Sequence, residues 1–85
     1  MRKKVLVVDD SAVMRKHIQT VLNNAGYEVI FAINGQDCLT QIALNTPDVV
    51  TLDINMPVMD GIACLKQIMT THPLPVIMVS SLTRK

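Results

Sequence analysis

The sequence predicts an α/β domain in which a parallel β-sheet carries helices on both faces. Short apolar runs alternate with segments whose apolar residues repeat at helical spacing, and the order is strand, helix, strand, helix, strand, helix, strand. The first run is apolar at every position, which is typical of a strand buried on both sides of a parallel sheet. Right-handed crossovers between such strands distribute the helices over two layers.

Four strands are predicted from apolar runs bounded by polar or turn-forming residues. They cover residues 5–8, 29–32, 48–52 and 76–79. Asn34 and Gly35 follow the second run and predict a turn. No repeat or linker interrupts the alternation, so a single domain is expected.

Three helices are predicted between these strands. The first begins near Ser11, a residue type that caps helices, and ends at Gly26, a residue type that often follows them. The second ends before Pro47, because a residue that precedes proline disfavours the helical conformation. A loop over residues 55–61 leads into the third helix, which Pro73 ends.

Composition limits the class of protein. With 85 residues, 49% of them hydrophobic and 18% charged, the chain is expected to fold around an aliphatic core and not to be disordered. A net charge of +1 gives little attraction to nucleic acid or to an anionic membrane, so neither is expected as a partner. The apolar run after Lys4 is too short for a secretion signal, and a cytoplasmic protein is expected.

Several polar residues are predicted to have structural roles only. Cys38 and Cys64 lie on apolar helical faces and are predicted to be buried thiols. Asp48 and Asp60 are interpreted as helix caps or turn formers. His17 and His72 are also predicted to be surface residues, not metal ligands or phosphate carriers.

Three carboxylates are predicted to meet at one edge of the sheet. Asp9 and Asp10 close the first strand, and Asp53 closes the third. If these strands are adjacent and parallel, their carboxyl ends share the edge at which open α/β folds bind ligands. Close carboxylates repel one another unless a cation lies among them, and oxygen donors suit Mg²⁺. The pattern therefore predicts a divalent metal site.

Four motifs along the chain resemble the receiver domain of two-component response regulators. They are VVDDS at residues 7–11, LDINMP at 52–57, MDG at 59–61 and VIMVS at 76–80. Residues 74–83 resemble, more narrowly, the receiver of the chemotaxis protein-glutamate methylesterase. The resemblance covers all 85 residues and implies a flavodoxin-like sheet of order 2-1-3-4 in one partial receiver domain, residues 1–85. A complete receiver adds a fourth helix, a fifth strand with a phosphate-binding Lys, and a fifth helix.

The resemblance also implies a role for each matching residue. Asp53 would be the phosphoacceptor, taking a phosphoryl group from a chemotaxis-type sensor histidine kinase. Asp10, the backbone carbonyl of Asn55, and Asp9 either directly or through water would hold Mg²⁺, for which Mn²⁺ can substitute. Ser80 would donate its hydroxyl to a phosphoryl oxygen.

Alternatives to this interpretation remain open at the level of sequence. A stand-alone chemotaxis-type regulator would have the same motifs as the regulatory domain of a methylesterase, whose catalytic domain and downstream partners would lie outside this chain. A phosphohydrolase of the haloacid-dehalogenase type also uses a strand-end Asp, but it needs a second Asp where this chain has Asn55. A purely structural interaction module would leave the acidic residues unexplained.

An assembly is also expected from the resemblance. In the order 2-1-3-4, the strand at residues 76–79 lies at an edge of the sheet, where unpaired backbone groups recruit other chains. We therefore expect a homodimer, either through pairing of the fourth strands or through exchange of elements between the two copies.

Overall fold

Four parallel strands form one sheet in this computed structural model, which describes residues 2–54 and 59–79. The strands are β1 (Lys4–Val8), β2 (Glu28–Ala32), β3 (Val49–Asp53) and β4 (Val76–Val79). Their order in the sheet is β2-β1-β3-β4, and all three neighbouring pairs are parallel. The predicted flavodoxin-like order is therefore confirmed, and each predicted strand is found to within one residue at its ends.

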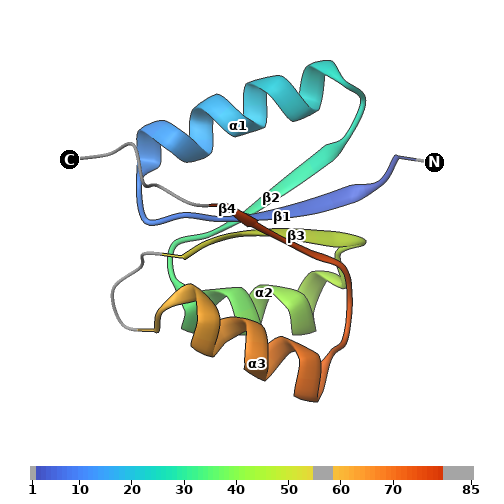
Figure 1. Cartoon of the computed structure of the whole chain (residues 1–85). Helices are drawn as coiled ribbons and strands as arrows, with labels where there is room; N and C mark the ends of the chain where they lie inside the picture. Colours follow the sequence, from blue (N-terminus) through green and yellow to red (C-terminus); the bar gives the residue numbers. More distant parts are fainter. Residues whose placement is uncertain (1, 55–58, 80–85) are drawn as a thin grey trace.

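Three helices connect the strands and lie in two layers. They are α1 (Ala12–Asn24), α2 (Gly35–Asn45) and α3 (Gly61–Thr71). Figure 1 shows α1 on one face of the sheet and α2 and α3 together on the other. Among the described residues, no helix combines the length and the apolar character needed to cross a membrane.

A polar side chain caps the start of every helix. Ser11 Oγ accepts a hydrogen bond from the amide of Met14 at 3.3 Å, and Asp60 caps α3 in the same way. Asn34 accepts from the amide of Asp37 at 2.8 Å, while the Asp37 carboxylate accepts from the amide of Ile33 at 3.0 Å. Asn34 is therefore the N-cap of α2, and Asp37 holds the backbone of the residue that precedes this cap. The predicted turn at Asn34 and Gly35 is therefore wrong, because Gly35 is already the first residue of α2.

The helix ends agree with the expected stop signals. After α1, Gly26 has φ of +94°, a conformation that side chains with a Cβ rarely adopt. After α2, Thr46 has φ of 43° and directly precedes Pro47. The chain thus reverses sharply at both positions and returns to the next strand.

The main core lies between the sheet and the layer of α2 and α3. The buried side chains of this cluster come from alternate positions of the strands and from the inward faces of the two helices: Leu6, Val8, Ala32, Cys38, Ile42, Val50, Leu52, Cys64 and Ile68. Val76 and Met78 of β4 pack against the same cluster. Strand side chains alternate between faces, so Ile77 and Val79 belong to the other face.

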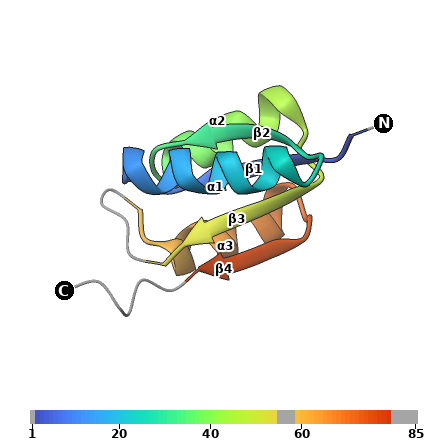
Figure 2. The same ribbon diagram turned by 90° about the horizontal axis from the view of Figure 1, so that it is seen from above.

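That other face is covered less completely. Val5 and Val7 of the central strand are buried there. In Figure 2, α1 lies beside β3 and β4 and not over them, and its contacts are with β1 and β2. Ile77 is 56% exposed as a result, and none of the α1 side chains is fully buried.

Candidate functional site

The carboxyl edge of the sheet brings three aspartates together. Val8 of β1 is level with Leu52 of β3, so the residues that follow, Asp9 and Asp53, lie next to each other. Asp10 follows in the turn into α1. One carboxylate oxygen of each residue lies within 4.8 Å of those of the other two. The structure therefore brings together the three acidic residues that the strand ends predict to converge.

The three aspartates differ in burial. Asp9 is 4% exposed and Asp53 is 2% exposed, whereas Asp10 is at the surface. Burial of a charged carboxylate is unfavourable without compensating hydrogen bonds, and Asp9 Oδ1 accepts one from the amide of Ser11 at 2.8 Å. The cluster is therefore buried at Asp9 and Asp53 and open to solvent at Asp10.

The turn between β1 and α1 holds Asp9 through its backbone as well. The amide of Asp9 donates to the carbonyl of Ala32 at 3.2 Å, which extends the β1–β2 pairing by one residue. Arg15 Nη1 donates to the carbonyl oxygen of Asp9 at 2.7 Å. Sequence reasoning missed this role of Arg15. Its position four residues after the helix cap Ser11 is the only sequence signal that it could reach the turn.

Gly61 fixes the backbone of Asp53 from the other side. A Cβ atom at Gly61 would lie 2.5 Å from the carbonyl oxygen of Asp53 and 2.7 Å from the Cα of Ile54. The amide of Gly61 donates to the carbonyl of Ile54 at 2.9 Å, and the amide of Ile54 donates to the carbonyl of Val79 at 3.1 Å. The end of β3 is therefore held between the start of α3 and β4, in a space that only glycine fits.

Two predicted site residues, Asn55 and Ser80, lie outside the described residues, so their roles stay predictions. The predicted role of Asp60 is confirmed, since it caps α3. Asp48 also has a structural role, but it does not cap a helix; its carboxylate instead accepts a hydrogen bond from the amide of Lys4, at the start of β1, at 2.7 Å. Cys38 and Cys64 are buried free thiols. The exposed histidines, His17 and His72, are the surface residues that the sequence predicts.

The donor set of the acidic cluster fits a hard divalent cation. Carboxylate oxygens are the preferred ligands of Mg²⁺, which binds them at about 2.1 Å, so that opposite ligands lie roughly 4.2 Å apart. The spread of up to 4.8 Å between the oxygens of Asp9, Asp10 and Asp53 is close to that span. A bound cation would also offset the repulsion among the three carboxylates.

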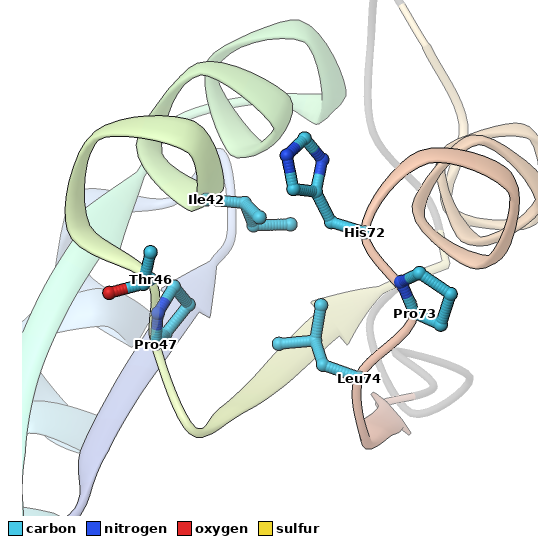
Figure 3. A pocket seen from close by; sticks show the side chains of 6 residues that line it. All are labelled: Ile42, Thr46, Pro47, His72, Pro73 and Leu74. Atoms are coloured by element: carbon cyan, nitrogen blue, oxygen red, sulfur yellow. The ribbon is translucent and has the colours of Figure 1, made fainter.

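A separate cavity of about 230 Å³ opens at the opposite edge of the sheet, where α2 and α3 end. Its lining is largely apolar and consists of Ile42, Thr46, Pro47, His72, Pro73 and Leu74. Figure 3 shows these side chains coming from the end of α2 and from the connection between α3 and β4. No carboxylate lies among them, so the acidic cluster is the stronger candidate for a functional site.

A parallel sheet of order β2-β1-β3-β4 with an acidic cluster at its carboxyl edge defines a receiver-type domain. Comparison with known families agrees, because the model of the response regulator receiver domain matches residues 5–85. The chain therefore belongs to the response regulator receiver domain family.

Its relatives and the solved structures similar to it include chemotaxis receivers. A protein-glutamate methylesterase/protein-glutamine glutaminase of Rhodospirillum rubrum is 57% identical over 81 residues, which are 94% of this chain and 22% of the relative. The response regulator domain of Thermotoga maritima CheB is 42% identical with a TM-score of 0.91, over 100% of this chain and 65% of that one. The chemotaxis regulator CheY4 of Vibrio cholerae gives 34% and 0.90, over 99% and 72%. The chain thus spans less than a quarter of the Rhodospirillum relative's length.

Proposed function

We propose that this chain accepts a phosphoryl group on Asp53 from a phosphohistidine of a chemotaxis-type sensor histidine kinase. One observation carries the proposal. Asp53 ends β3 with its carboxylate within 4.8 Å of the carboxylates of Asp9 and Asp10, at the ligand-binding edge of the sheet. Phosphoryl transfer needs little from a protein beyond positioning and neutralisation of charge, and this edge can supply both.

The acidic cluster would hold Mg²⁺, or Mn²⁺ in its place. Asp10, Asp9 and the backbone carbonyl of Asn55 would supply ligands together with Asp53. The ion, when bound, would neutralise charge on the phosphoryl oxygens. The exposed position of Asp10 supports this assignment, because it leaves one side of the cluster open to solvent.

The residues of the chain have separate parts in the transfer. A carboxylate oxygen of Asp53 attacks the phosphorus atom, the bond between phosphorus and the histidine nitrogen breaks, and an acyl phosphate forms. Gly61 holds the Asp53 backbone in place during this step. The hydroxyl of Ser80 would then donate to a phosphoryl oxygen and report its presence.

Asn55, two residues after Asp53, favours an acyl phosphate that persists as a signal over one that the chain itself hydrolyses. An amide neither takes up nor releases a proton near neutral pH, so it cannot act as the general acid and base of a haloacid-dehalogenase-type phosphohydrolase. Turnover of substrate is therefore not proposed for this chain.

We propose that the chain is the regulatory receiver of a chemotaxis methylesterase. It would form one partial domain over residues 1–85 and act in the cytoplasm. The 57% identity with the Rhodospirillum relative supports this placement over a stand-alone regulator, the alternative that the likeness to CheY4 keeps in view. Methylesterase activity would reside in an output domain outside these residues.

We also propose that the 85-residue chain by itself forms a homodimer through β4. In the described sheet β4 is an edge strand, and Ile77 on it is 56% exposed. Edge strands with apolar side chains recruit other strands, and a second copy offers the same edge.

Labelling with acetyl phosphate tests the phosphoacceptor. We expect a phosphorylated species in the presence of Mg²⁺, at least about tenfold less of it after chelation, and none above background in Asp53→Asn. Asp10→Ala should lose the rise in thermal stability that millimolar Mg²⁺ gives the parent, because a ligand of the folded state stabilises it.

Matched controls are available in the same chain. Asp48→Asn changes a carboxylate outside the cluster, and Glu28→Ala removes an exposed acidic residue at the start of β2. Both should keep labelling and the response to Mg²⁺. Equal labelling of Asp53→Asn and the parent would disprove the assignment of the acceptor.

A further inference from the structure

Two buried cysteines lie on α2 and α3, the two helices that together cover one face of the sheet. These two helices are called the closed layer below. Cys38 is the fourth residue of α2 and Cys64 the fourth residue of α3, and both are 0% exposed. The two helices pack side by side, as Figure 1 also shows. Both thiols are free, and nothing in the phosphoacceptor chemistry uses them.

The two thiols are in direct contact. The Cys38 side chain hydrogen-bonds to Cys64, and Cys64 Sγ lies 3.6 Å from the carbonyl oxygen of Gly35, to which it donates. A disulfide has a bond length of about 2.05 Å, so the two sulfurs must move closer together for a crosslink to form. The packing of α2 against α3 already places the two side chains in the same buried cluster.

The contact also makes the two thiols unequal. The hydrogen bond to Cys64, together with burial, raises the pKa of Cys38 above its ordinary value. The same hydrogen bond, donated by Cys38, lowers the pKa of Cys64, although burial acts against this. Because the thiolate is the reactive form, Cys64 is the nucleophile of the pair.

The position of the pair gives a crosslink a route to the acidic cluster. Cys64 lies one turn after Gly61, whose Cα is packed against the carbonyl of Asp53. Cys38 lies one turn after Gly35, where an added Cβ would be 2.9 Å from Met59. The first turns of α3 and α2 thus lie against Ile54 and Met59, respectively, near the end of β3.

We propose that Cys38 and Cys64 form a reversible disulfide when the protein meets a hydroperoxide. The Cys64 thiolate attacks the outer oxygen of the hydroperoxide, the oxygen–oxygen bond breaks, and a sulfenic acid and an alcohol form. The sulfur of Cys38 then attacks the sulfur of Cys64, the sulfur–oxygen bond breaks, and water leaves with the proton of Cys38. Two thiols lose two electrons and two protons, and the hydroperoxide becomes an alcohol and water.

Burial sets the rate of this reaction. Neither sulfur is exposed, so the oxidant reaches them in molecules whose first helical turns have opened transiently. The crosslink should form slowly, and it should be removed by a dithiol reductant only after a similar opening.

Mass spectrometry after treatment with tert-butyl hydroperoxide tests the proposal. The parent should lose the mass of two hydrogen atoms, and peptide mapping should join Cys38 to Cys64 within one chain. The crosslink should raise the midpoint of thermal unfolding by about 10 °C, since it constrains the unfolded chain. Thiols that stay reduced, crosslinks between chains, or oxidation to separate sulfinic acids would overturn it.

Single variants test the order of attack. Cys38→Ser keeps a hydroxyl that can donate to Cys64 and should leave Cys64 as a sulfenic acid that dimedone traps, at about ten times the level seen for Cys38 in Cys64→Ser. Equal trapping in the two variants would overturn the assignment of the nucleophile. Neither measurement depends on phosphorylation, so the outcome is independent of the function proposed for Asp53.

Discussion

α2 and α3 together cover one face of the sheet, whereas α1 alone lies on the other and packs mainly against β1 and β2. The first face holds the main cluster of buried side chains, and Ile77 of the second face is 56% exposed. Asp53 is connected to both faces of the sheet. Its side chain alternates with Leu52 and so faces the less covered layer, while its backbone is held by Gly61 of the closed layer. The comparison suggests that the closed layer supplies rigidity and the other face leaves room for partners and ligands.

The largest difference between the faces should appear on truncation of an isoleucine. Ile68→Ala removes a side chain that is 0% exposed, and we expect it to lower the free energy of unfolding by about 2–5 kcal/mol. Ile77→Ala deletes the same atoms on the other face and should cost under about 1 kcal/mol in dilute solution. Urea denaturation of the two variants measures both effects.

The same face can also be tested through the association of two copies of the chain. If β4 pairs with a second copy, Ile77→Lys should shift the parent from dimer to monomer in sedimentation experiments at micromolar concentration. A parent that sediments as a monomer at that concentration contradicts the proposed dimer. A cost for Ile77→Ala equal to that for Ile68→Ala in dilute solution would contradict the contrast between the faces.

A smaller effect is expected where the closed layer touches the site. Gly61→Ala would place a Cβ 2.5 Å from the Asp53 carbonyl oxygen, so the backbone must shift, at a cost of about 1–3 kcal/mol. Stabilisation by Mg²⁺ should weaken at the same time, because Asp53 moves. Thermal shift assays with and without Mg²⁺ measure both quantities.

Gly26→Ala is the matched control. Gly26 has φ of +94° and nothing within 4 Å of the added Cβ, so the change should cost about 1 kcal/mol through backbone strain alone. Its Mg²⁺ response should equal that of the parent. Loss of the Mg²⁺ response in Gly26→Ala would mean that general destabilisation, not displacement of Asp53, explains the result for Gly61→Ala.

The smallest effect is a change in the free energy of unfolding at alkaline pH, which tests how well the closed layer excludes water. The Cys38 thiol has a pKa raised above the ordinary 9.0 by its hydrogen bond to Cys64 and by burial. Above pH 9.0 the unfolded chain releases this proton and the folded chain keeps it. Stability should therefore fall as pH rises, by up to about 1.4 kcal/mol per pH unit.

Comparison with Cys38→Ser tests this contribution, because the serine hydroxyl can still donate to Cys64. Cys64, whose pKa is lowered by that hydrogen bond, has released its proton in both states above about pH 10 and adds little to the slope there. The variant should show a shallower decline in the free energy of unfolding from about pH 10 to about pH 11 under reducing conditions. Identical slopes would show that Cys38 ionises in the folded protein as it does in the unfolded chain.

Much of the fold follows from local sequence, and the exceptions have physical reasons. The apolar run around Leu6 and the stop at Pro47 predict elements close to those observed. The turn predicted at Gly35 fails because Asn34 accepts from the amide of Asp37 and Asp37 accepts from the amide of Ile33, which only their joint geometry reveals.

The site shows the same division. Residues at strand ends predict that Asp9, Asp10 and Asp53 meet. Arg15 reaches the carbonyl of Asp9 within the same turn, and only its position after Ser11 signals this contact. Two other contacts depend on how helices pack, and no local pattern encodes them: Gly61 with Asp53, and Cys38 with Cys64. These contacts exist only because of the positions that the helices take on the sheet.

The level pairing of Val8 with Leu52 has a consequence for how this domain can change in evolution. Side chains alternate along β3, so one residue inserted within the strand would turn Asp53 to the opposite face and separate it from Asp9. Insertions should be tolerated instead where the chain enters the sheet at the amino ends of β3 and β4, near Thr46 and Pro73. Lineages that keep the acidic cluster should therefore vary in length before these amino ends and keep the length of β3 unchanged.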